Sequence, residues 1–335
     1  MIAATGVSVV EELFSNFWVV LVLKTAAVLG FFLVVPLGVG YLEHKVLAHM
    51  QARLGPMEAG AFHGWAQLVA DGVKFIQKED VIPAAADRTV FSLAPAVAMI
   101  PYIAILVVLP LSGSAFAEDL DVGIFFVMAM SSVSVIGVMM AGWSSANKFS
   151  LIGALRAAAQ LIAYELPLVL GAAGVVMLAG TLSMVGIVEA QRDMWFVIPL
   201  APLFLIFMIA SLAELTRPPF DMPVADSEII FGAYTEYTGL KFAFFLLAEY
   251  GGIVALSGVA SVLFLGGYLS PPGLALPGPL MMMGKIGVLS FVVIWLRATY
   301  PRLREDQLQR FAWVTLVPAS LVWILGTGFV KVWWQ

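Results

Sequence analysis

Eight long apolar runs limit what this chain can fold into. Each run is long enough to cross roughly 30 Å of hydrocarbon as an α-helix. The chain is 61% hydrophobic and 12% charged, with a mean hydropathy of +0.99, whereas a soluble domain needs about twice that charge. The sequence therefore predicts an all-α integral membrane protein, with residues 1–335 forming a single membrane domain. We expect the transmembrane helices near residues 17–41, 89–112, 122–143, 158–184, 196–213, 242–267, 283–300 and 312–331.

Basic residues gather in every second loop of this arrangement. The opposite side holds only Arg192, Lys285 and Lys331. Cytoplasmic loops of membrane proteins carry an excess of Lys and Arg. We therefore expect the basic loops in the cytoplasm and both termini on the outer side. These cytoplasmic loops are residues 42–88, 144–157, 214–241 and 301–311.

The first of these loops is too long for a simple connection and contains a helical pattern. Apolar residues recur at helical spacing on one side and polar residues on the other. The apolar side holds Trp65, Leu68, Val69, Gly72, Phe75 and Ile76, and the polar side holds Gln67, Asp71, Lys74 and Lys78. This pattern predicts an amphipathic helix at the membrane interface, between the first two spans. A surface helix that only caps the bundle would give the same pattern.

Carboxylates are concentrated where the apolar runs leave little room for charge. The stretch from Ala213 to Tyr250 lies between two apolar runs and is rich in Asp and Glu. A charge inside the bilayer costs a few kcal/mol, so such a carboxylate must face the protein interior or a wet cavity. For any single carboxylate, a structural ion pair with an arginine is the alternative. We expect a hydrated internal path for protons, lined by Glu165, Glu214, Asp226, Glu228 and Glu249.

The composition also excludes several kinds of site. The chain has no cysteine and only three histidines. Thiolate-held iron–sulfur clusters and a cysteine nucleophile are therefore excluded, and haem or zinc would find few ligands. We expect no metal site and no catalytic nucleophile, so a redox cofactor would have to belong to a partner. A net charge of −5 gives no sign of nucleic-acid binding.

Six motifs follow one another along the chain. They are Glu43 to Pro56 (EHKVLAHMQARLGP), Ala70 to Lys74 (ADGVK) with Lys78-Glu79, Gly153 to Gln160 (GALRAAAQ) with Tyr164 to Pro167 (YELP), Arg217 to Asp221 (RPPFD), Ser227-Glu228, and Pro301 to Leu308 (PRLREDQL). Together they closely resemble the family of H subunits of bacterial NADH:quinone oxidoreductase, the respiratory complex I. The mitochondrially encoded subunit 1 of that complex is a homologue. The match runs from about residue 17 to residue 331.

The resemblance implies a function that the residues alone do not give. In that family the protein docks against a peripheral arm that carries FMN and iron–sulfur clusters. It lies beside small and antiporter-like membrane subunits of the same H⁺-translocating enzyme. The resemblance thus implies a bacterial inner (plasma) membrane, quinone as the substrate, and no cofactor bound by this chain alone.

The same resemblance assigns residues to two functional regions. It implies a quinone chamber formed with Lys45, Arg53, Arg217, Phe220, Asp221, Asp226 and Glu228. It also implies that the proton path continues beyond the carboxylates given above. The added residues are Glu43, Asp71, Lys74, Glu79 and Arg297.

Two other functions remain open from the sequence. The membrane anchor of an energy-converting hydrogenase or formate-linked complex shares this bundle, but pairs with a nickel–iron partner and need not reduce quinone. The full motif series through Lys78-Glu79 favours the quinone enzyme. A stand-alone proton or cation transporter is the second alternative. The sequence has no inverted repeat and no pair of interrupted helices in matching positions, which disfavours it.

Overall fold

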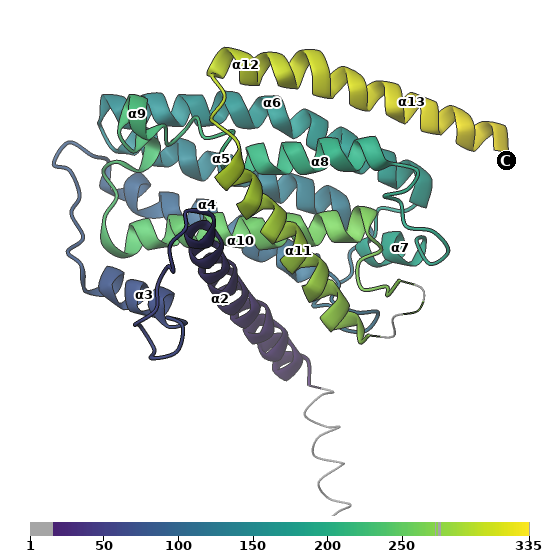
Figure 1. Cartoon of the computed structure of the whole chain (residues 1–335), viewed down its shortest axis with the longest axis horizontal. Helices are drawn as coiled ribbons and strands as arrows, with labels where there is room; N and C mark the ends of the chain where they lie inside the picture. The colour runs from purple at the N-terminus through teal and green to yellow at the C-terminus, as the bar shows by residue number, and fades with distance from the viewer. Residues whose placement is uncertain (1–15, 272, 274–275, 335) are drawn as a thin grey trace, which may run out of the picture.

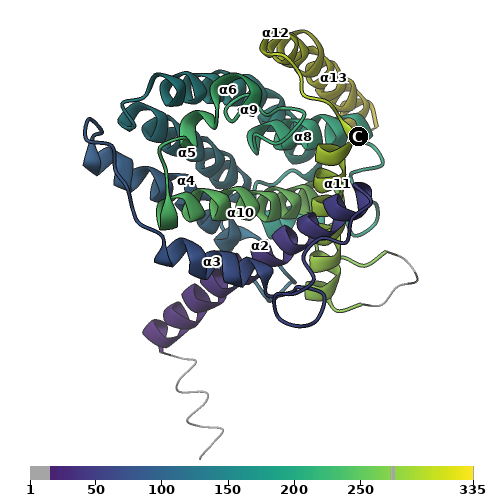
Figure 2. The ribbon, with the colours of Figure 1, turned by 60° about the vertical axis from the view of Figure 1, so that its left-hand side comes forward.

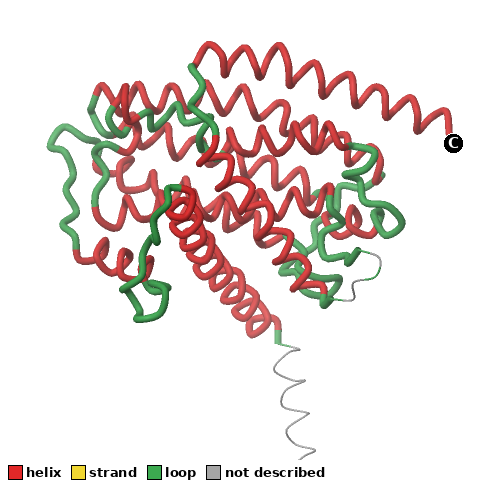
Figure 3. Tube along the Cα trace, in the orientation of Figure 1, coloured by secondary structure: helices red, strands yellow, loops and turns green. Residues whose placement is uncertain are grey.

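The computed structural model describes residues 16–271, 273 and 276–334, with the backbone alone at residues 226, 227 and 334. This part of the chain consists of helices and loops, without a strand (Figure 3). The α-helices are α2 (Phe17–Met50), α3 (Gln67–Gln77), α4 (Arg88–Val108), α5 (Gly123–Ser144), α6 (Lys148–Ala179), α7 (Met184–Glu189), α8 (Ala201–Glu214), α9 (Asp226–Ile229), α10 (Gly239–Phe264), α11 (Gly278–Thr299), α12 (Glu305–Arg310) and α13 (Val317–Trp334). A 3₁₀ turn, η1 (Gly232–Tyr234), precedes α10, and a π-helical segment, η2 (Phe311–Leu316), joins α12 to α13.

Seven helical segments are long and apolar enough to cross a membrane, which confirms the prediction of a multi-pass helical membrane protein. Several of them extend beyond the expected spans, α2 and α6 by the most. α2 continues to Met50, and α6 begins at Lys148, where the side chain of Asn147 accepts a hydrogen bond from the amide of Phe149. The seven segments are α2, α4, α5, α6, α10, α11 and residues 305–333 of α12, η2 and α13.

The expected span at 196–213 is shorter than predicted. Only α8 is helical there, and its 14 residues cover about 21 Å of a bilayer core of about 30 Å. The preceding residues form turns. The side-chain oxygen of Gln191 accepts a hydrogen bond from the amide of Phe196 and another from the amide of Gly266, just after α10. The amide of Val197 also donates to the carbonyl oxygen of Phe264 at 2.8 Å. These contacts hold the chain outside helical geometry, so the described residues contain seven full-length candidate spans and not eight.

The central helix of the bundle is α10. In its most apolar window 61% of the residues are buried, against 6% in that of α2. α4, α6 and α8 lie against α10, and α5 packs on α4 and α6, while α2 and α11 cross α10 obliquely (Figures 1 and 2). α13 packs on α6 and α8 along the upper edge of the bundle in Figure 1. The charged residues of α10, Lys241 and Glu249, are therefore only partly exposed, at 17% and 32%.

The helix α3 occupies the place of the expected amphipathic helix. Its Phe75 ring lies 5.8 Å from the ring of Phe242 on α10, and Leu68 lies against α2 at Gly40. Other apolar side chains of the expected apolar side point away from the bundle instead. Those exposed are Trp65, Val69 and Ile76, with exposed fractions of 61%, 52% and 67%; Val73, which the predicted apolar side did not include, is 48% exposed. α3 therefore packs on the bundle with one part of its apolar surface and leaves another part uncovered.

Candidate functional site

A guanidinium buried inside the bundle organises the candidate site. Nη1 of Arg217 lies 2.5 Å from Oε2 of Glu43, and its Nε lies 2.5 Å from Oε1 of Glu249. Arg297 pairs with the other carboxylate oxygen of Glu43, and the ring of Tyr250 stacks below Arg217 at 4.9 Å. We call Glu43, Arg217, Glu249 and Arg297 the ionic centre. Its positive and negative charges cancel, as burial requires, because an unpaired buried charge costs several kcal/mol.

Four elements far apart in the sequence meet at the ionic centre. Glu43 lies toward the C-terminal end of α2, Glu249 lies on α10, and Arg297 lies in the last turn of α11. Arg217 lies in the loop that follows α8. The oblique crossing of α2 and α11 over α10 is what brings these side chains together (Figure 1).

The loop after α8 is held in place by one buried side chain of α6. The amide of Gln160 donates to the carbonyl oxygens of Ala213 and Phe220, at 2.7 Å each. The ring of Phe220 packs on the ring of Tyr164 at 5.1 Å. Because the loop is fixed on both sides of Arg217, the guanidinium stays directed at the ionic centre.

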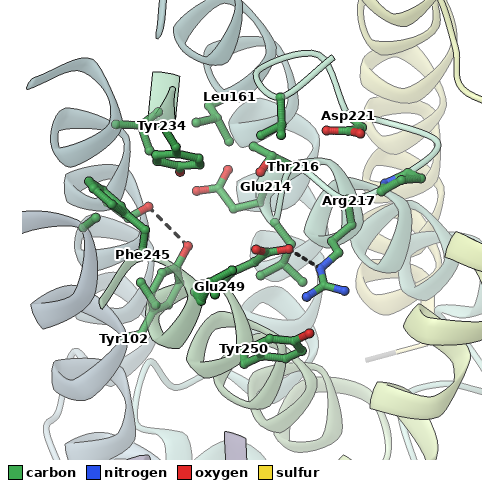
Figure 4. Close-up of a pocket in the computed structure, with 18 of the residues that line it drawn as sticks. Tyr102, Leu161, Glu214, Thr216, Arg217, Asp221, Tyr234, Phe245, Glu249 and Tyr250 are labelled. Carbon is green, nitrogen blue, oxygen red and sulfur yellow. Dashed lines mark hydrogen bonds and ion pairs between the residues drawn. The ribbon is translucent and has the colours of Figure 1, made fainter. Parts of the chain in front are cut away.

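A cavity of about 240 Å³ lies beside the ionic centre. Figure 4 shows Glu214 and Glu249 pointing into it, with Tyr102 and Tyr234 nearby. Aliphatic and aromatic side chains form the rest of its wall. The cavity can therefore hold an apolar molecule while offering it ionisable partners. The polar members of the wall are Tyr102, Ser134, Glu214, Thr216, Arg217, Asp221, Tyr234, Glu249, Tyr250 and Arg297.

Glu214 differs from the carboxylates of the ionic centre. It is 5% exposed, and its Oε2 has no hydrogen-bond partner among the described residues. Glu165 on α6 lies close enough for the two charges to repel, and it accepts a hydrogen bond from Ser132 on α5. A buried carboxyl without a cation suits the binding and release of a proton better than a permanent charge.

A second group of charges fixes the loop after α8, which forms part of the cavity wall. We call Arg156, Glu228, Arg302 and Glu305 the loop anchor. Glu228 follows the loop and lies 2.6 Å from Nη1 of Arg156 and 3.3 Å from Nη2 of Arg302. Arg156 also approaches Glu305 at 3.7 Å. The anchor thus joins the loop to α6 and to the segment before α12.

The loop anchor is expected to weaken in acid. The hydrogen bond from Arg156 lowers the pKa of Glu228 below its ordinary value; partial burial opposes this shift, and the charge of Arg302 adds to it. A carboxyl whose pKa is lowered on folding stabilises the fold above its ordinary pKa, and this contribution is lost as the pH falls through the lowered pKa. Amide exchange of residues 221–231, corrected for intrinsic rates, should therefore lose protection below about pH 4. Glu228→Gln should remove that pH dependence. Equal protection of the unchanged chain above and below about pH 4 would contradict the expected weakening of the loop anchor.

The structure separates the predicted site residues into three groups. Those that line the cavity are Glu214, Arg217, Asp221, Glu249 and Arg297. Those that belong to the ionic centre or loop anchor, or pack beside the cavity, are Glu43, Glu165, Phe220 and Glu228. Those outside the cavity wall are Lys45, Arg53, Asp71, Lys74 and Glu79. The backbone of Asp226 begins α9, and its side chain lies outside the described residues.

The residues outside the cavity wall make local contacts around α3. Nζ of Lys45 donates to the carbonyl oxygen of Pro56 at 2.5 Å. Asp71 pairs with Lys74 at 3.0 Å on α3. Partial burial raises the pKa of Asp71, but the hydrogen bonds from Lys74 and Gln67 outweigh it, so the pKa lies below its ordinary value. The Lys45 contact joins the end of α2 to the segment before α3, and the Asp71–Lys74 pair lies within α3 itself.

Three tyrosines of the cavity were missed by reasoning from the sequence. Tyr102 lies on α4, Tyr234 in η1 and Tyr250 on α10. A tyrosine in or beside an apolar run reads as a packing residue, and the sequence offers only one further signal. That signal is the position of Tyr250 directly after Glu249, and it is weak, because consecutive residues of a helix do not face the same side.

Fold and site together define the class of the protein. The chain is a multi-pass helical membrane protein with a charge-balanced ionic centre beside an internal cavity. Within that class, the chain belongs to the NADH dehydrogenase family, whose family model matches residues 23–328.

Curated relatives give the same family. A Geobacillus kaustophilus protein is 47% identical over 292 residues, which cover 87% of this chain and 88% of the relative. A Brevibacillus brevis protein is 45% identical over 316 residues, covering 94% and 93% of the two chains. A Dehalococcoides mccartyi protein is also 45% identical over 316 residues, covering 94% and 88%. All three are named as the H subunit of NADH-quinone oxidoreductase, which confirms the resemblance found in the motifs.

Proposed function

We propose that this chain is a membrane subunit of a proton-pumping NADH:quinone oxidoreductase. It helps to form the quinone chamber and the first part of the charged path that couples quinone reduction to proton translocation. The observation that carries this proposal is the cavity, where Glu214, Arg217 and Glu249 face aromatic and aliphatic walls. Membership of the family and the names of the relatives support it.

The chemistry of quinone reduction fits such a cavity. Reduction consumes electrons and protons, and the electrons come from iron–sulfur clusters and FMN in partner subunits, because this chain has no cysteine to hold a cluster. An apolar quinone tail lies along the apolar wall, and the polar head meets groups such as Asp221 and Arg217. Reduction changes the local charge, and interacting carboxylates then change protonation together. Glu249 and Glu214 carry that response toward the small and antiporter-like membrane subunits.

The residues outside the cavity wall belong to the edges of this system. Lys45 and Arg53, at the end of α2 and in the turn after it, frame the chamber mouth beside α3. Phe220, Asp226 and Glu228 shape the loop over the chamber. The path further includes Glu43 and Arg297 of the ionic centre, with Glu165 next to Glu214. Asp71, Lys74 and Glu79 form its outermost part.

We place the protein in a bacterial inner membrane with both termini on the outer side. On this arrangement α8 makes the fifth crossing together with the turns at residues 195–200, although α8 alone is too short. The positive charges of the loops at 42–88, 144–157, 214–241 and 301–311 support a cytoplasmic location for them.

We further propose that the uncovered apolar side of α3 lies in lipid. Val69, Val73 and Ile76 are exposed, although each is apolar. Because the chain has no cysteine of its own, single cysteines can be introduced and spin-labelled. Labels at Val69 or Val73 should be relaxed by oxygen, and a label at Lys74 by a water-soluble nickel chelate. Equal access of the nickel chelate to all three positions would place α3 in water or against another surface.

Affinity purification from native membranes tests the assignment. Recovery with flavin and iron–sulfur subunits, and inhibitor-sensitive NADH oxidation by quinone, is the expected result. Recovery with a nickel–iron subunit would assign the chain to the hydrogenase or formate-linked group. Recovery alone, with proton conduction in vesicles, would assign it to the transporters.

A further inference from the structure

The proposed proton path contains a gap between two carboxyl groups. Glu249 is ion-paired with Arg217 on one side of the cavity. Glu214, from α8, has a buried oxygen without a hydrogen-bond partner among the described residues. A proton that moves from one carboxyl to the other needs a hydrogen-bonding group in the space between them.

The hydroxyl of Tyr102 lines the same cavity as both carboxyl groups. Figure 4 draws it to one side of Glu214 and Glu249, and the charges of both act on it. The hydroxyl donates a hydrogen bond to Oγ of Ser134 at 3.3 Å, and Ser134 donates to the carbonyl oxygen of Ser131 at 2.8 Å. Tyr102 and Ser134 are both 6% exposed, so this pair is a polar site inside apolar helices α4 and α5.

Close packing at Gly252 fixes the position of the phenol. A Cβ at residue 252 would lie 3.0 Å from Cζ of Tyr102, the atom that bears the hydroxyl. It would also lie 2.7 Å from Cδ2 of Leu215, the neighbour of Glu214 in the chain. Gly252 is three residues after Glu249, which places both on one side of α10. The tip of the phenol thus lies against α10 at the same glycine that Leu215, the neighbour of Glu214, approaches.

We infer that Tyr102 transfers protons between Glu249 and Glu214, with Ser134 holding its hydroxyl between transfers; this inference rests on the proposed function. A protonated Glu249 gives its proton to the phenol oxygen while the original O–H proton of Tyr102 passes to Glu214. One O–H bond forms and one breaks at Tyr102, which remains a neutral phenol. Glu249 is left as a carboxylate paired with Arg217, and no electron is transferred.

The substitution Tyr102→Phe tests this role, because it removes the oxygen and keeps the ring packed on Gly252. In the complete oxidoreductase reconstituted in vesicles, it should slow quinone-coupled proton uptake at least about fivefold. The solvent deuterium isotope effect on turnover should rise, because proton transfer becomes limiting. Tyr237→Phe is the matched control: this buried tyrosine donates to the carbonyl oxygen of Phe91 at 3.0 Å and does not line the cavity. Both quantities should be unchanged in the control.

The outcomes separate this inference from the proposed function. If Glu214→Gln and Glu249→Gln abolish coupling but Tyr102→Phe leaves rate and isotope effect unchanged, the role of Tyr102 is wrong. A slower Tyr102→Phe enzyme with an unchanged isotope effect also contradicts it, because packing alone then explains the loss. If all three variants couple normally, the proposed function fails as well. Should Tyr102→Phe fail to assemble, Ser134→Ala must shift the pH profile of turnover, and an unchanged profile overturns the inference.

Discussion

Replacing Arg217 by leucine is expected to lower the stability of the folded protein by about 3 to 5 kcal/mol. The guanidinium is 1% exposed and neutralises two carboxylates, of which Glu43 is 2% exposed. Leucine would leave Glu249 unpaired and Glu43 with Arg297 alone. The thermal transition of the purified complex should fall, and less of the protein should be recovered in membranes.

Two companion variants make the cause of that loss clear. Adding Glu249→Gln to Arg217→Leu removes the unpaired carboxylate, leaves Glu43 paired with Arg297, and should restore much of the stability. Arg304→Gln is the matched control, because Arg304 is 79% exposed and pairs with Asp306 at the surface. It should cost under about 1 kcal/mol. If the Arg217→Leu complex has the same thermal transition temperature as the unchanged complex, the ionic centre does not support the fold.

Replacing Glu214 by glutamine is expected to abolish proton coupling while leaving the fold intact. Glutamine has nearly the same shape but cannot take up and release a proton at this place. General acid–base groups contribute about 10² to 10⁴ in rate, so a loss of at least about tenfold in coupled quinone reduction is expected. The measurements are NADH oxidation by quinone and proton uptake into vesicles that contain the complete oxidoreductase.

Glu118→Gln is the control for this substitution. Glu118 is 61% exposed and pairs with Lys24 at 3.4 Å, and it does not line the cavity. Its replacement should leave coupling and thermal transition unchanged. Normal coupling in Glu214→Gln would remove Glu214 from the path. A lowered thermal transition in that variant would mean that the carboxyl serves the fold.

Most of the membrane bundle could be predicted because helix formation in a bilayer depends on local sequence. A segment in lipid must satisfy its own backbone hydrogen bonds, so length and apolarity suffice to predict a helix. The exception is the expected fifth span. Its first part is apolar enough, but Gln191 and the end of α10 bind its backbone amides in turns. Those partners are tertiary contacts, which a local pattern does not report.

The site was predicted in its residue types but not in its geometry. Glu214 and Glu249 stood out because charges are rare in apolar surroundings, whereas Arg217 was assigned through the family resemblance. Their pairing could not be predicted, since Glu43 and Arg217 are 174 positions apart and meet only through helix crossing. Tyr102 gave no sequence signal, because its hydroxyl gains importance only from the approach of α4 to α10 at Gly252.

The most direct test of the account is whether quinone reduction changes the protonation of the cavity carboxyl groups. Infrared difference spectra of the complete oxidoreductase, recorded on addition of NADH and quinone, report protonated carboxyl groups through their C=O stretching bands. We expect a carboxyl band in the unchanged complex that is lost in Glu214→Gln, altered in Glu249→Gln and kept in Glu118→Gln. Identical difference spectra in all four proteins would contradict the claim that this cavity couples quinone reduction to proton movement.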